Sequence, residues 1–438
     1  MSTPLYSWGR FPQTPQHGHS CVWRDELPAR LDRVIEQYGS SLPYGNGRSY
    51  GDSCLAASDQ VLHLRLLDRL IEADWDAGIL KVEAGITLAE VLSVTIPRGW
   101  FLPVTPGTQF ATVGGAIAND VHGKNHHVRG TFGRHVRSFG LLRHAQPEIV
   151  CAPDVNTSLF AASIGGLGLT GVIHWAELQL MPIRASQIDT MTVRFNNLAE
   201  FFALSDELDN QHEYSVAWVD CLARGAETGR GVFIVGDHAR YGSLDVRART
   251  KLSVPLTPPF SLINKLSLSA FNDLYWRVHP SERKTARSAY EPFFYPLDRI
   301  LHWNRIYGRR GFQQYQCVIP STNAEAAMGE LLQAIADAGQ GSFLAVLKRC
   351  GNALSPGLLS FPMPGTSLAL DFPQSEHLQD VVFPRLDAIV RAAAGRLYPA
   401  KDAHMSGADF RQAYPAWERL ETLRDPSLMS RFWSRVLL

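Results

Sequence analysis

The chain has 438 residues, which is long enough for two domains. Its composition, 45% hydrophobic and 19% charged, excludes disorder and a coiled coil. Its 42 basic residues balance 42 acidic ones, so charge gives no support to a nucleic-acid partner. The six cysteines contain no C-x-x-C pair, so we expect a reduced, cytoplasmic protein. No run of about eighteen apolar residues occurs, so we expect no membrane span.

Hydrophobic periodicity in the first hundred residues predicts short elements around a glycine-rich loop. We expect helices over 27–37 and 87–95 and strands over 61–67, 79–82 and 100–104. The loop itself, SLPYGNGRSYGDSC over 41–54, is turn-rich and contains Arg48. Glycine backbone donors beside a fixed cation favour an anionic ligand.

The stretch Pro106–His127, PGTQFATVGGAIANDVHGKNHH, combines glycines, an apolar patch and histidines. Gly114 and Gly115 before Ala-Ile-Ala predict a loop that leads into a short helix, with room for a planar or anionic ligand against the backbone. The histidines are His122, His126 and His127. The stretch has no H-E-x-x-H and a single nearby carboxylate, Asp120, so we expect no metal.

A second glycine loop, IGGLGLTG over 164–171, follows the end of a predicted helix at 159–163 and precedes a predicted strand at 172–181. Its glycines satisfy G-x-G-x-x-G. The dinucleotide motif of that form requires a strand before the glycines and a helix after them. The order here is reversed, so we interpret the match as chance.

Beyond Pro182 the pattern predicts an α+β domain. We expect a helix over 198–208, strands over 214–220 and 231–236, a strand over 312–319, a helix capped by Ser321 or Thr322 and ending at Ala338, strands over 342–350 and 366–372, a helix over 378–390 and an Arg-rich helical tail. Ser253–Ala270 mixes Pro and Leu without a period. It is a mobile lid, a surface that meets something apolar, or a disordered connector.

Seven segments together resemble the flavin oxidases of the vanillyl-alcohol-oxidase and p-cresol-methylhydroxylase family. They are GNGRSYGD (45–52), PGT…TVGGAIA…D.HGKNHH (106–127), GG.GLTG (165–171), WNR.YG..GF.QYQ.VIP (303–320), SFL.V.K (342–348), LSFP.PG (359–365) and GRLY.AKD (395–402). The resemblance spans nearly the whole chain. It implies an α+β, two-domain FAD-binding fold of that type, with an FAD-binding domain over 1–183 and 394–438 and an α+β substrate-binding domain over 184–393.

The resemblance also implies the site residues. Those expected to bind FAD are Gly45, Asn46, Gly47, Arg48, Ser49, Tyr50, Gly51, Thr108, Thr112, Gly114, Gly115, Ala118, Asn119, His122, Gly123, Asn125, His127, Gly171, Val172, Ile173 and Tyr398. Those expected around the substrate are Lys124, Trp218, Gln316, Lys348, Ser367 and Ala369. Lys401 is expected to assist loss of the hydroxyl proton, with Tyr50 and His122 as the other catalytic residues. Related oxidases that tether flavin covalently place a histidine where this chain has Arg48, so we expect non-covalent FAD.

Within the family, the motifs are most similar to enzymes that oxidise the 2′-hydroxyl of a polyprenylphosphoryl-β-D-ribose to a ketone, the first half of an epimerisation to the arabinose form. The resemblance implies a separate NADH-dependent keto-reductase partner and leaves open a peripheral contact with the inner face of the membrane. Ala369 and Ser367 depart from the cysteine and asparagine of that subfamily, so the lipid portion is not fixed. Two alternatives stay open: a sugar, alditol or aldonolactone oxidase with a soluble substrate, and a flavoprotein subunit without catalysis.

Overall fold

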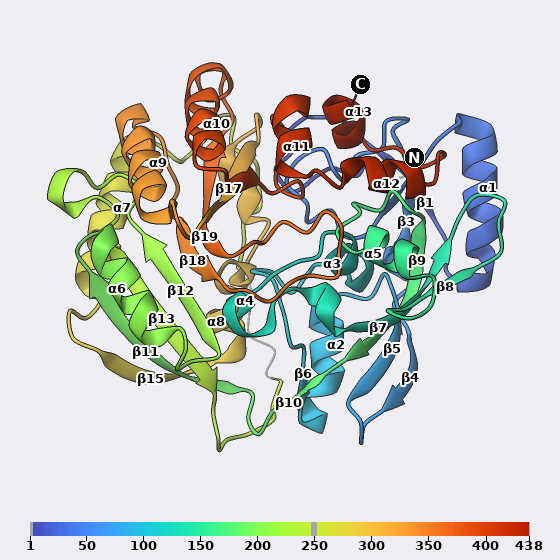
Figure 1. The fold of residues 1–438 in the computed structure, drawn as a ribbon, viewed down its shortest axis with the longest axis horizontal. Coiled ribbons are helices and arrows are strands. Elements are labelled where there is room, and N and C mark those ends of the chain that lie inside the picture. Colours follow the sequence, from blue (N-terminus) through green and yellow to red (C-terminus); the bar gives the residue numbers. More distant parts are fainter. Residues whose placement is uncertain (1–2, 247–251, 438) are drawn as a thin grey trace.

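The computed structural model describes residues 3–246 and 252–437. Two small sheets lie on the right-hand side of the molecule in Figure 1. A parallel sheet has the order β1 (His17–Ser20), β3 (Gln60–His63), β2 (Leu42–Tyr44) and packs against α1 (Leu27–Tyr38). An antiparallel sheet has the order β4 (Leu70–Asp74), β5 (Ile79–Glu83), β9 (Val172–Gln179), β7 (Val136–Leu142), β8 (Ile149–Cys151). Around them lie α2 (Leu88–Thr95), β6 (Trp100–Phe101), α3 (Val113–Ala118), α4 (His126–Arg129), α5 (Thr157–Ser163) and β10 (Met181–Pro182).

An eight-stranded antiparallel sheet forms the other side. Its order is β15 (Lys284–Ala289), β11 (Gln187–Phe195), β13 (Gly231–His238), β12 (Tyr214–Val219), β18 (Val346–Cys350), β19 (Gly365–Pro373), β17 (Phe312–Pro320), β20 (Arg396–Leu397). One face is apolar and packs against α6 (Leu198–Leu208), α9 (Ala324–Ala338) and α10 (Phe383–Ala392). Because side chains alternate along a strand, the other face presents a different set, which lines a cavity.

The C-terminal segment returns to the first side of the molecule as α11 (Gly407–Ala413), α12 (Trp417–Leu423) and α13 (Arg431–Leu437). Its first residues form β20, the edge strand of the eight-stranded sheet, before the chain crosses back. The boundaries at 183 and 394 therefore fall close to the points where the chain changes sheets, and the division into domains stays a prediction.

Most elements begin and end near the predicted residues, and the exceptions have local causes. The expected strand over 61–67 ends at His63, and the strand expected from 342 begins only at Val346. There the Ser342 hydroxyl bonds the backbone of Leu344, a local turn that competes with strand pairing. The expected cap at Ser321 or Thr322 is wrong, because those residues form a turn and Asn323 precedes α9.

The segment Ser253–Ala270, which showed no period in the sequence, contains the end of a strand, a loop and the first part of a helix. β14 (Leu252–Ser253) pairs with β16 (Ile300–Leu301), and α7 (Lys265–Val278) begins after Asn264, whose side chain accepts from Leu266 N and Ser267 N at 3.1 Å each. The short helix α8 (Tyr290–Phe294) follows β15. None of the helices in the described residues is both long and apolar enough to cross a membrane.

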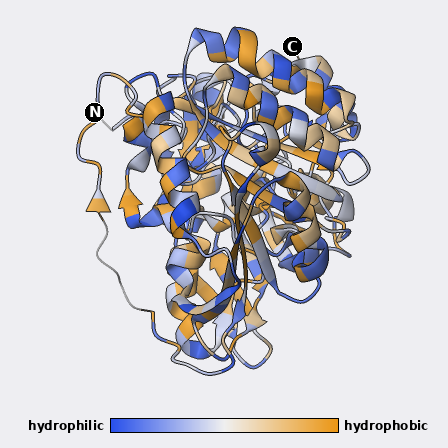
Figure 2. Cartoon of the chain, turned by 90° about the vertical axis from the view of Figure 1, so that its left-hand side faces the viewer, coloured by the Kyte–Doolittle hydropathy of each residue, from blue (hydrophilic) through white to orange (hydrophobic). Residues whose placement is uncertain are grey.

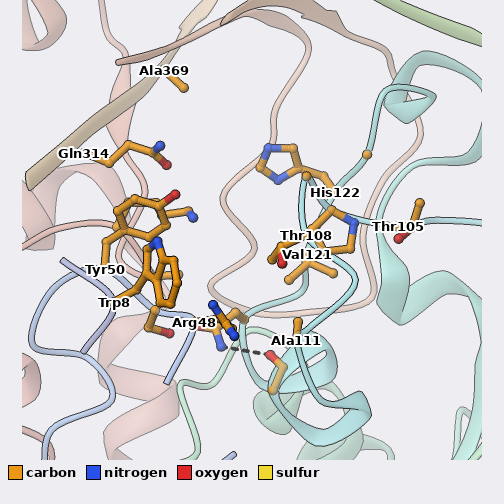
Figure 3. Close-up of a pocket in the computed structure, with 18 of the residues that line it drawn as sticks. Trp8, Arg48, Tyr50, Thr105, Thr108, Ala111, Val121, His122, Gln314 and Ala369 are labelled. Atoms are coloured by element: carbon orange, nitrogen blue, oxygen red, sulfur yellow. Dashed lines mark hydrogen bonds between the residues drawn. The ribbon is translucent and has the colours of Figure 1, made fainter. Parts of the chain in front are cut away.

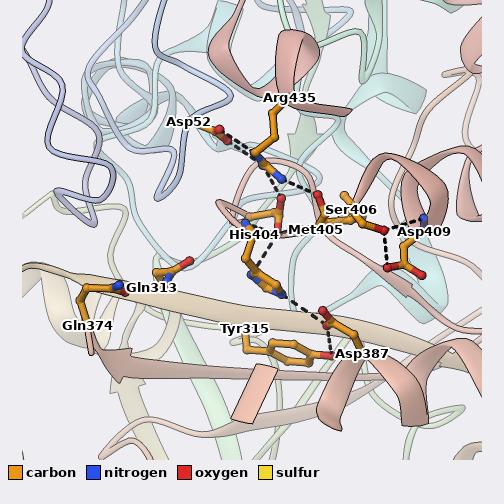
Figure 4. A network of polar contacts seen from close by, with 11 residues as sticks. Asp52, Gln313, Tyr315, Gln374, Asp387, His404, Met405, Ser406, Asp409 and Arg435 are labelled. Carbon is orange, nitrogen blue, oxygen red and sulfur yellow. Dashed lines mark hydrogen bonds and ion pairs between the residues drawn. The ribbon is translucent and has the colours of Figure 1, made fainter. Parts of the chain in front are cut away.

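A buried ionic network joins the C-terminal helix to the rest of the chain (Figure 4). Arg435 donates to Asp52 at 2.9 Å and to Asp402 at 2.7 Å. His404 lies between Asp402 at 3.2 Å and Asp387 at 3.3 Å. Burial alone would lower the pKa of His404, but the two carboxylates raise it above its ordinary value.

We expect Arg435→Met to lower the free energy of unfolding of the holo-protein by about 3–5 kcal/mol, because it leaves the buried Asp52 without its cation and leaves Asp402 with His404 alone. Urea unfolding followed by circular dichroism measures the change. Arg391→Met is the control, because Arg391 is half exposed and its pair with Asp409 is worth below about 1 kcal/mol. Equal losses in the two variants would show that the network does not hold the C-terminal helix.

Candidate active site

A cavity of about 580 Å³ lies between the two sides of the molecule. The eight-stranded sheet contributes alternate side chains to it, among them Trp218, Gln314, Gln316, Lys348, Ser367 and Ala369. The loops after β2 and β6, helix α3 and the loop after β20 contribute to the other walls, together with residues of α7 and of the segment around α8. Cavities of this size, about 300–1,000 Å³, are usual for small molecules and cofactors.

The loop after β2 brings a buried cation to the cavity. Gly47 has φ +60°, a left-handed conformation that suits glycine, and the turn directs Arg48 inward. The Arg48 guanidinium lies 4.1 Å from the Trp8 ring and 5.0 Å from the Phe110 ring. Figure 3 shows Trp8, Arg48 and Tyr50 together on one wall. The buried Nε of Arg48 finds no acceptor among the described residues.

Helix α3 forms a second wall, and it corrects the expectation that Gly114 and Gly115 precede the helix. Both glycines lie in its first turn, where Thr112 is the N-cap and accepts from Gly115 N at 3.2 Å. A Cβ on Gly114 would press on Ala84, so this glycine allows close packing against the end of β5. A Cβ on Gly115 would meet Thr112 alone and otherwise project into the cavity.

His122 is buried opposite the eight-stranded sheet. Its Nε2 lies 3.1 Å from Gln316 Nε2, while its Nδ1 is buried without a partner in the described part of the chain. Burial lowers the pKa of His122 well below its ordinary value, and the nearby Lys348, His126 and Lys401 lower it further. The imidazole is therefore neutral. With Gln316 as donor, Nε2 accepts and Nδ1 carries the proton.

Three buried lysines converge on the same cavity. Lys348 Nζ donates to Gly123 O at 2.8 Å, and Lys124 Nζ lies 5.8 Å from the Phe293 ring. Burial lowers the pKa of each to about 8. With Lys401 and Arg48, four basic side chains line the cavity, against one carboxylate, Asp298. Asp298 accepts from Gln109 N at 2.8 Å.

Lys401 lies on the loop after β20, over an aromatic ring. Its Nζ is 3.7 Å from the centre of the Tyr50 ring. Burial lowers the pKa of Lys401, and the charge of Asp371 opposes that effect. Asp371 is buried on β19, where Gln314 Nε2 donates to its Oδ1 at 2.7 Å, and burial raises its pKa. Burial also raises the pKa of Tyr50, which keeps its proton.

The structure brings most of the expected site residues to this cavity. The expected residues that line it are Gly45, Asn46, Gly47, Arg48, Ser49, Tyr50, Thr108, Thr112, Gly114, Gly115, Ala118, Asn119, His122, Gly123, Lys124, Gly171, Ile173, Trp218, Gln316, Lys348, Ser367, Ala369, Tyr398 and Lys401. Their individual roles stay predictions.

Four expected cofactor residues do not line the cavity, because other contacts hold them. A Cβ on Gly51 would collide with the carbonyl of Asp402, so this glycine permits a backbone contact. Asn125 donates to Pro103 O at 2.8 Å, and His127 Nε2 lies 3.1 Å from His212 O. Val172 is buried in the cluster around α1.

Sequence reasoning missed several residues in the cavity or behind its wall. Asp371 lies outside the cavity lining, but it shares a strand face with Ser367 and Ala369, so strand alternation could have indicated it. Trp8 and Asp298 gave no signal, because they reach the cavity from distant parts of the chain. In the described residues, no three His, Cys, Asp or Glu side chains gather as a metal site requires.

The cavity fits FAD, which carries two phosphates and a flat ring. Gly107 and Gly115 have no side chain, and the space that a Cβ would occupy at each position is open to a ligand. The unpartnered Arg48 Nε and His122 Nδ1 offer buried polar atoms to a ligand. Buried polar groups are ordinarily paired, so atoms of this kind in a cavity indicate a bound group.

Comparisons with known proteins agree with this fit. Residues 29–152 match a family model described as an FAD binding domain. Decaprenylphosphoryl-beta-D-ribose oxidase of Mycolicibacterium smegmatis is 34% identical over 442 residues, covering 96% of this chain and 94% of that protein. An uncharacterized protein in the mprA 5' region of Streptomyces coelicolor is 36% identical over 78% of this chain and 96% of that protein.

A more distant similarity is confined to part of the chain. Human Delta(24)-sterol reductase is 29% identical over 121 residues, which are 28% of this chain and 23% of that protein. The Mycolicibacterium similarity, in contrast, includes both sides of the molecule. It confirms the α+β, two-domain FAD-binding fold and FAD as the cofactor. The chain therefore belongs to the family of FAD-dependent oxidoreductases that includes decaprenylphosphoryl-beta-D-ribose oxidase.

Proposed function

We propose that the protein oxidises the 2′-hydroxyl of a polyprenylphosphoryl-β-D-ribose to the 2′-keto compound, with non-covalently held FAD as the oxidant. The observation that carries the proposal is the pair of buried lysines, Lys124 and Lys348, that line the cavity in addition to Arg48, which we assign to FAD, and Lys401, which we assign to proton removal. Buried cations require an anion, and the phosphoryl group of such a sugar supplies one. A soluble alditol carries no charge to offer them. The name of the Mycolicibacterium relative supports the same substrate class.

Lys124 and Lys348 are the residues we assign to the substrate phosphate. Both are buried, which lowers the pKa of each to about 8, and an anion beside them would favour their charged form. Gln316 and Trp218 line the cavity beside Lys348, where an amide and an indole ring suit the hydroxyls and the face of a sugar. Ser367 and Ala369 leave a small, open surface on β19 next to them.

Lys401 is the group we assign to proton removal. Bound FAD would supply the acceptor for the hydride of the carbinol carbon. The hydroxyl proton passes to Lys401 Nζ, which must be neutral to receive it. Burial favours the neutral amine, while Asp371 favours the ammonium that forms. His122 and Tyr50 are the other catalytic residues in this proposal. His122 is neutral and Tyr50 keeps its proton, so both can donate a hydrogen bond to the substrate oxygen.

The ketone is the first half of an epimerisation to the arabinose form. Reduction from the opposite face needs a hydride donor, and we assign this step to a separate NADH-dependent keto-reductase. Arg48 supports non-covalent FAD, because a guanidinium cannot form the bond through which a histidine tethers flavin. We place the protein in the cytoplasm, where it would meet its lipid substrate at the inner face of the membrane.

Gly115→Val should lower the FAD content of the purified protein, because its side chain projects into the space that the cofactor needs. We expect loss of most bound flavin, measured as the ratio of absorbance at 450 nm to 280 nm, with far-ultraviolet circular dichroism unchanged. Gly329→Val is the matched control, since that helical glycine has one neighbouring atom at 4.0 Å. Normal flavin content in Gly115→Val would contradict the placement of FAD.

Lys401→Ala should slow flavin bleaching by roughly 10²–10⁴-fold at saturating polyprenylphosphoryl-ribose without oxygen, because the proton loses its acceptor. Stopped-flow absorbance measures the rate. Lys81→Ala is the control, since Lys81 lies over the Trp175 ring and outside the cavity. An unchanged rate in Lys401→Ala would remove the proposed base. If the wild type is not bleached by this substrate but oxidises free alditols with peroxide release, the proposed substrate is wrong.

Asp371→Asn should shift the pH dependence of the flavin-bleaching rate, so that the rise on the acidic side occurs at lower pH. The rate rises with pH as Lys401 loses its proton, and the carboxylate raises the pKa of Lys401 against the effect of burial. Removing the charge lowers that pKa, so the neutral amine persists at lower pH. Asparagine keeps an oxygen for Gln314. A rise that stays in place or moves to higher pH would contradict the coupling of Asp371 to Lys401.

A further inference from the structure

Exposed apolar side chains concentrate on one part of the surface. Of the twenty large apolar side chains exposed in the described residues, nine lie between 252 and 300. Six of them lie on α7 or on the loop before it, and we name these the apolar platform: Leu256, Phe260, Leu262, Leu266, Leu274 and Val278. Scattered apolar side chains are normal on a protein surface, whereas a contiguous group marks an interaction site.

The platform helix is fixed with its apolar side outward. On the inner side of α7, Leu268 is buried, Asn272 donates to Asp220 at 2.8 Å and Trp276 donates to Phe195 O at 3.0 Å. Helical spacing then directs Leu266 and Leu274 to solvent, where they are 84% and 62% exposed. The inner side of α7 therefore carries two hydrogen-bonded anchors beside one buried leucine, while Leu266 and Leu274 face the solvent, where an ordinary surface helix has polar residues.

The loop before α7 is held in place with its apolar side chains outward as well. Arg305 Nη1 donates to Val254 O and Pro255 O at 2.8 Å each, and Leu262 N donates to Ile306 O at 2.9 Å. Between these anchors, Phe260 is 69% exposed. Figure 2 shows the neighbouring strands β14 and β16 as orange arrows at the edge of the molecule. The exposure is thus built into the fold.

The charge of this region differs from that of the chain as a whole. Residues 252–310 contain nine Lys and Arg against four Asp and Glu, although the whole chain has no net charge. Arg299, Arg309 and Arg310 are exposed. Arg299 precedes the exposed Ile300, and the other two follow Gly308, which packs on the backbone of Phe260. Basic side chains thus border the platform.

A series of aromatic rings connects the platform with the cavity. Trp218 and Tyr275 both line the cavity, with ring centres 4.6 Å apart. Tyr275 stacks on Phe271 at 5.6 Å, and Phe271 is partly exposed on α7 beside Leu274. An apolar chain attached to a ligand in the cavity has a continuous apolar path to the surface there.

We propose that the apolar platform docks the protein on an anionic lipid bilayer. Leucine and phenylalanine side chains enter the boundary of the acyl chains while the bordering arginines meet anionic headgroups. The inference rests on the proposed function in one respect, because a polyprenyl substrate resides in a bilayer and its sugar must reach the cavity. A second copy of this chain fits the surface less well, because its own platform would bring the same positive charges together.

Vesicle flotation with the holo-protein, without substrate, tests the docking. We expect binding to vesicles of phosphatidylglycerol and phosphatidylcholine, with weaker binding to phosphatidylcholine alone and at high salt. Leu266→Ser with Leu274→Ser should weaken binding at least about tenfold, because two apolar side chains no longer leave water. Arg309→Gln with Arg310→Gln should weaken binding to the anionic vesicles at least about fivefold.

The matched control is Val150→Ser with Val155→Ser, which removes two exposed apolar side chains near β8 and should leave vesicle binding unchanged. Equal binding by the leucine variant and the wild type overturns the proposal, as does absence of wild-type binding. So does a wild-type dimer that the leucine variant converts to a monomer in light scattering. Flavin bleaching by detergent-solubilised polyprenylphosphoryl-ribose tests the proposed function separately, since it needs no vesicle.

Discussion

The contact between the loop at 49–52 and the loop at 398–402 is the constraint on which the site depends. Tyr50 N donates to Ala400 O at 3.0 Å, and Gly51 leaves no room for a side chain against the carbonyl of Asp402. The loop after β2 contributes Arg48 and Tyr50, and the later loop contributes Lys401. Because the backbones are in contact, Lys401 Nζ reaches the Tyr50 ring. The buried ionic network around Arg435 fixes the same two loops from behind.

Burial then gives similar side chains different properties. Lys124, Lys348 and Lys401 all lose hydration in the cavity, which lowers the pKa of each. Asp371 raises the pKa of Lys401 against the effect of burial, whereas the positive charge of Lys348 lowers the pKa of Lys124 further. An anionic ligand would return Lys124 and Lys348 towards their ordinary pKa. A neutral hydroxyl would not do so for Lys401, which suits a proton acceptor.

Sequence patterns predicted the local elements well because periodicity reports which side of an element is buried. The helix Leu198–Leu208 has the predicted bounds, and the bounds of β17 and β19 differ from the predicted ones by at most one residue at each end. Resemblance to a flavin oxidase family located most of the cavity, including Lys401 and His122. Neither the periodicity nor the family resemblance predicted contacts between distant segments. Asp298 reaches Thr108 across 190 residues, and no periodicity within either segment records that pairing.

The same limit explains why α7 escaped prediction. A surface helix is recognised by an apolar stripe that faces the core, but α7 anchors its inner side with Asn272 and Trp276 and leaves Leu274 outside. Its apolar residues therefore show no single buried face in the sequence. The hydrogen bonds of Asn272 and Trp276 hold the exposed leucines of α7 in water, where these leucines bury little apolar surface and add little to the stability of the fold. Their placement beside an aromatic path to the cavity is better explained by contact with the apolar environment of the substrate.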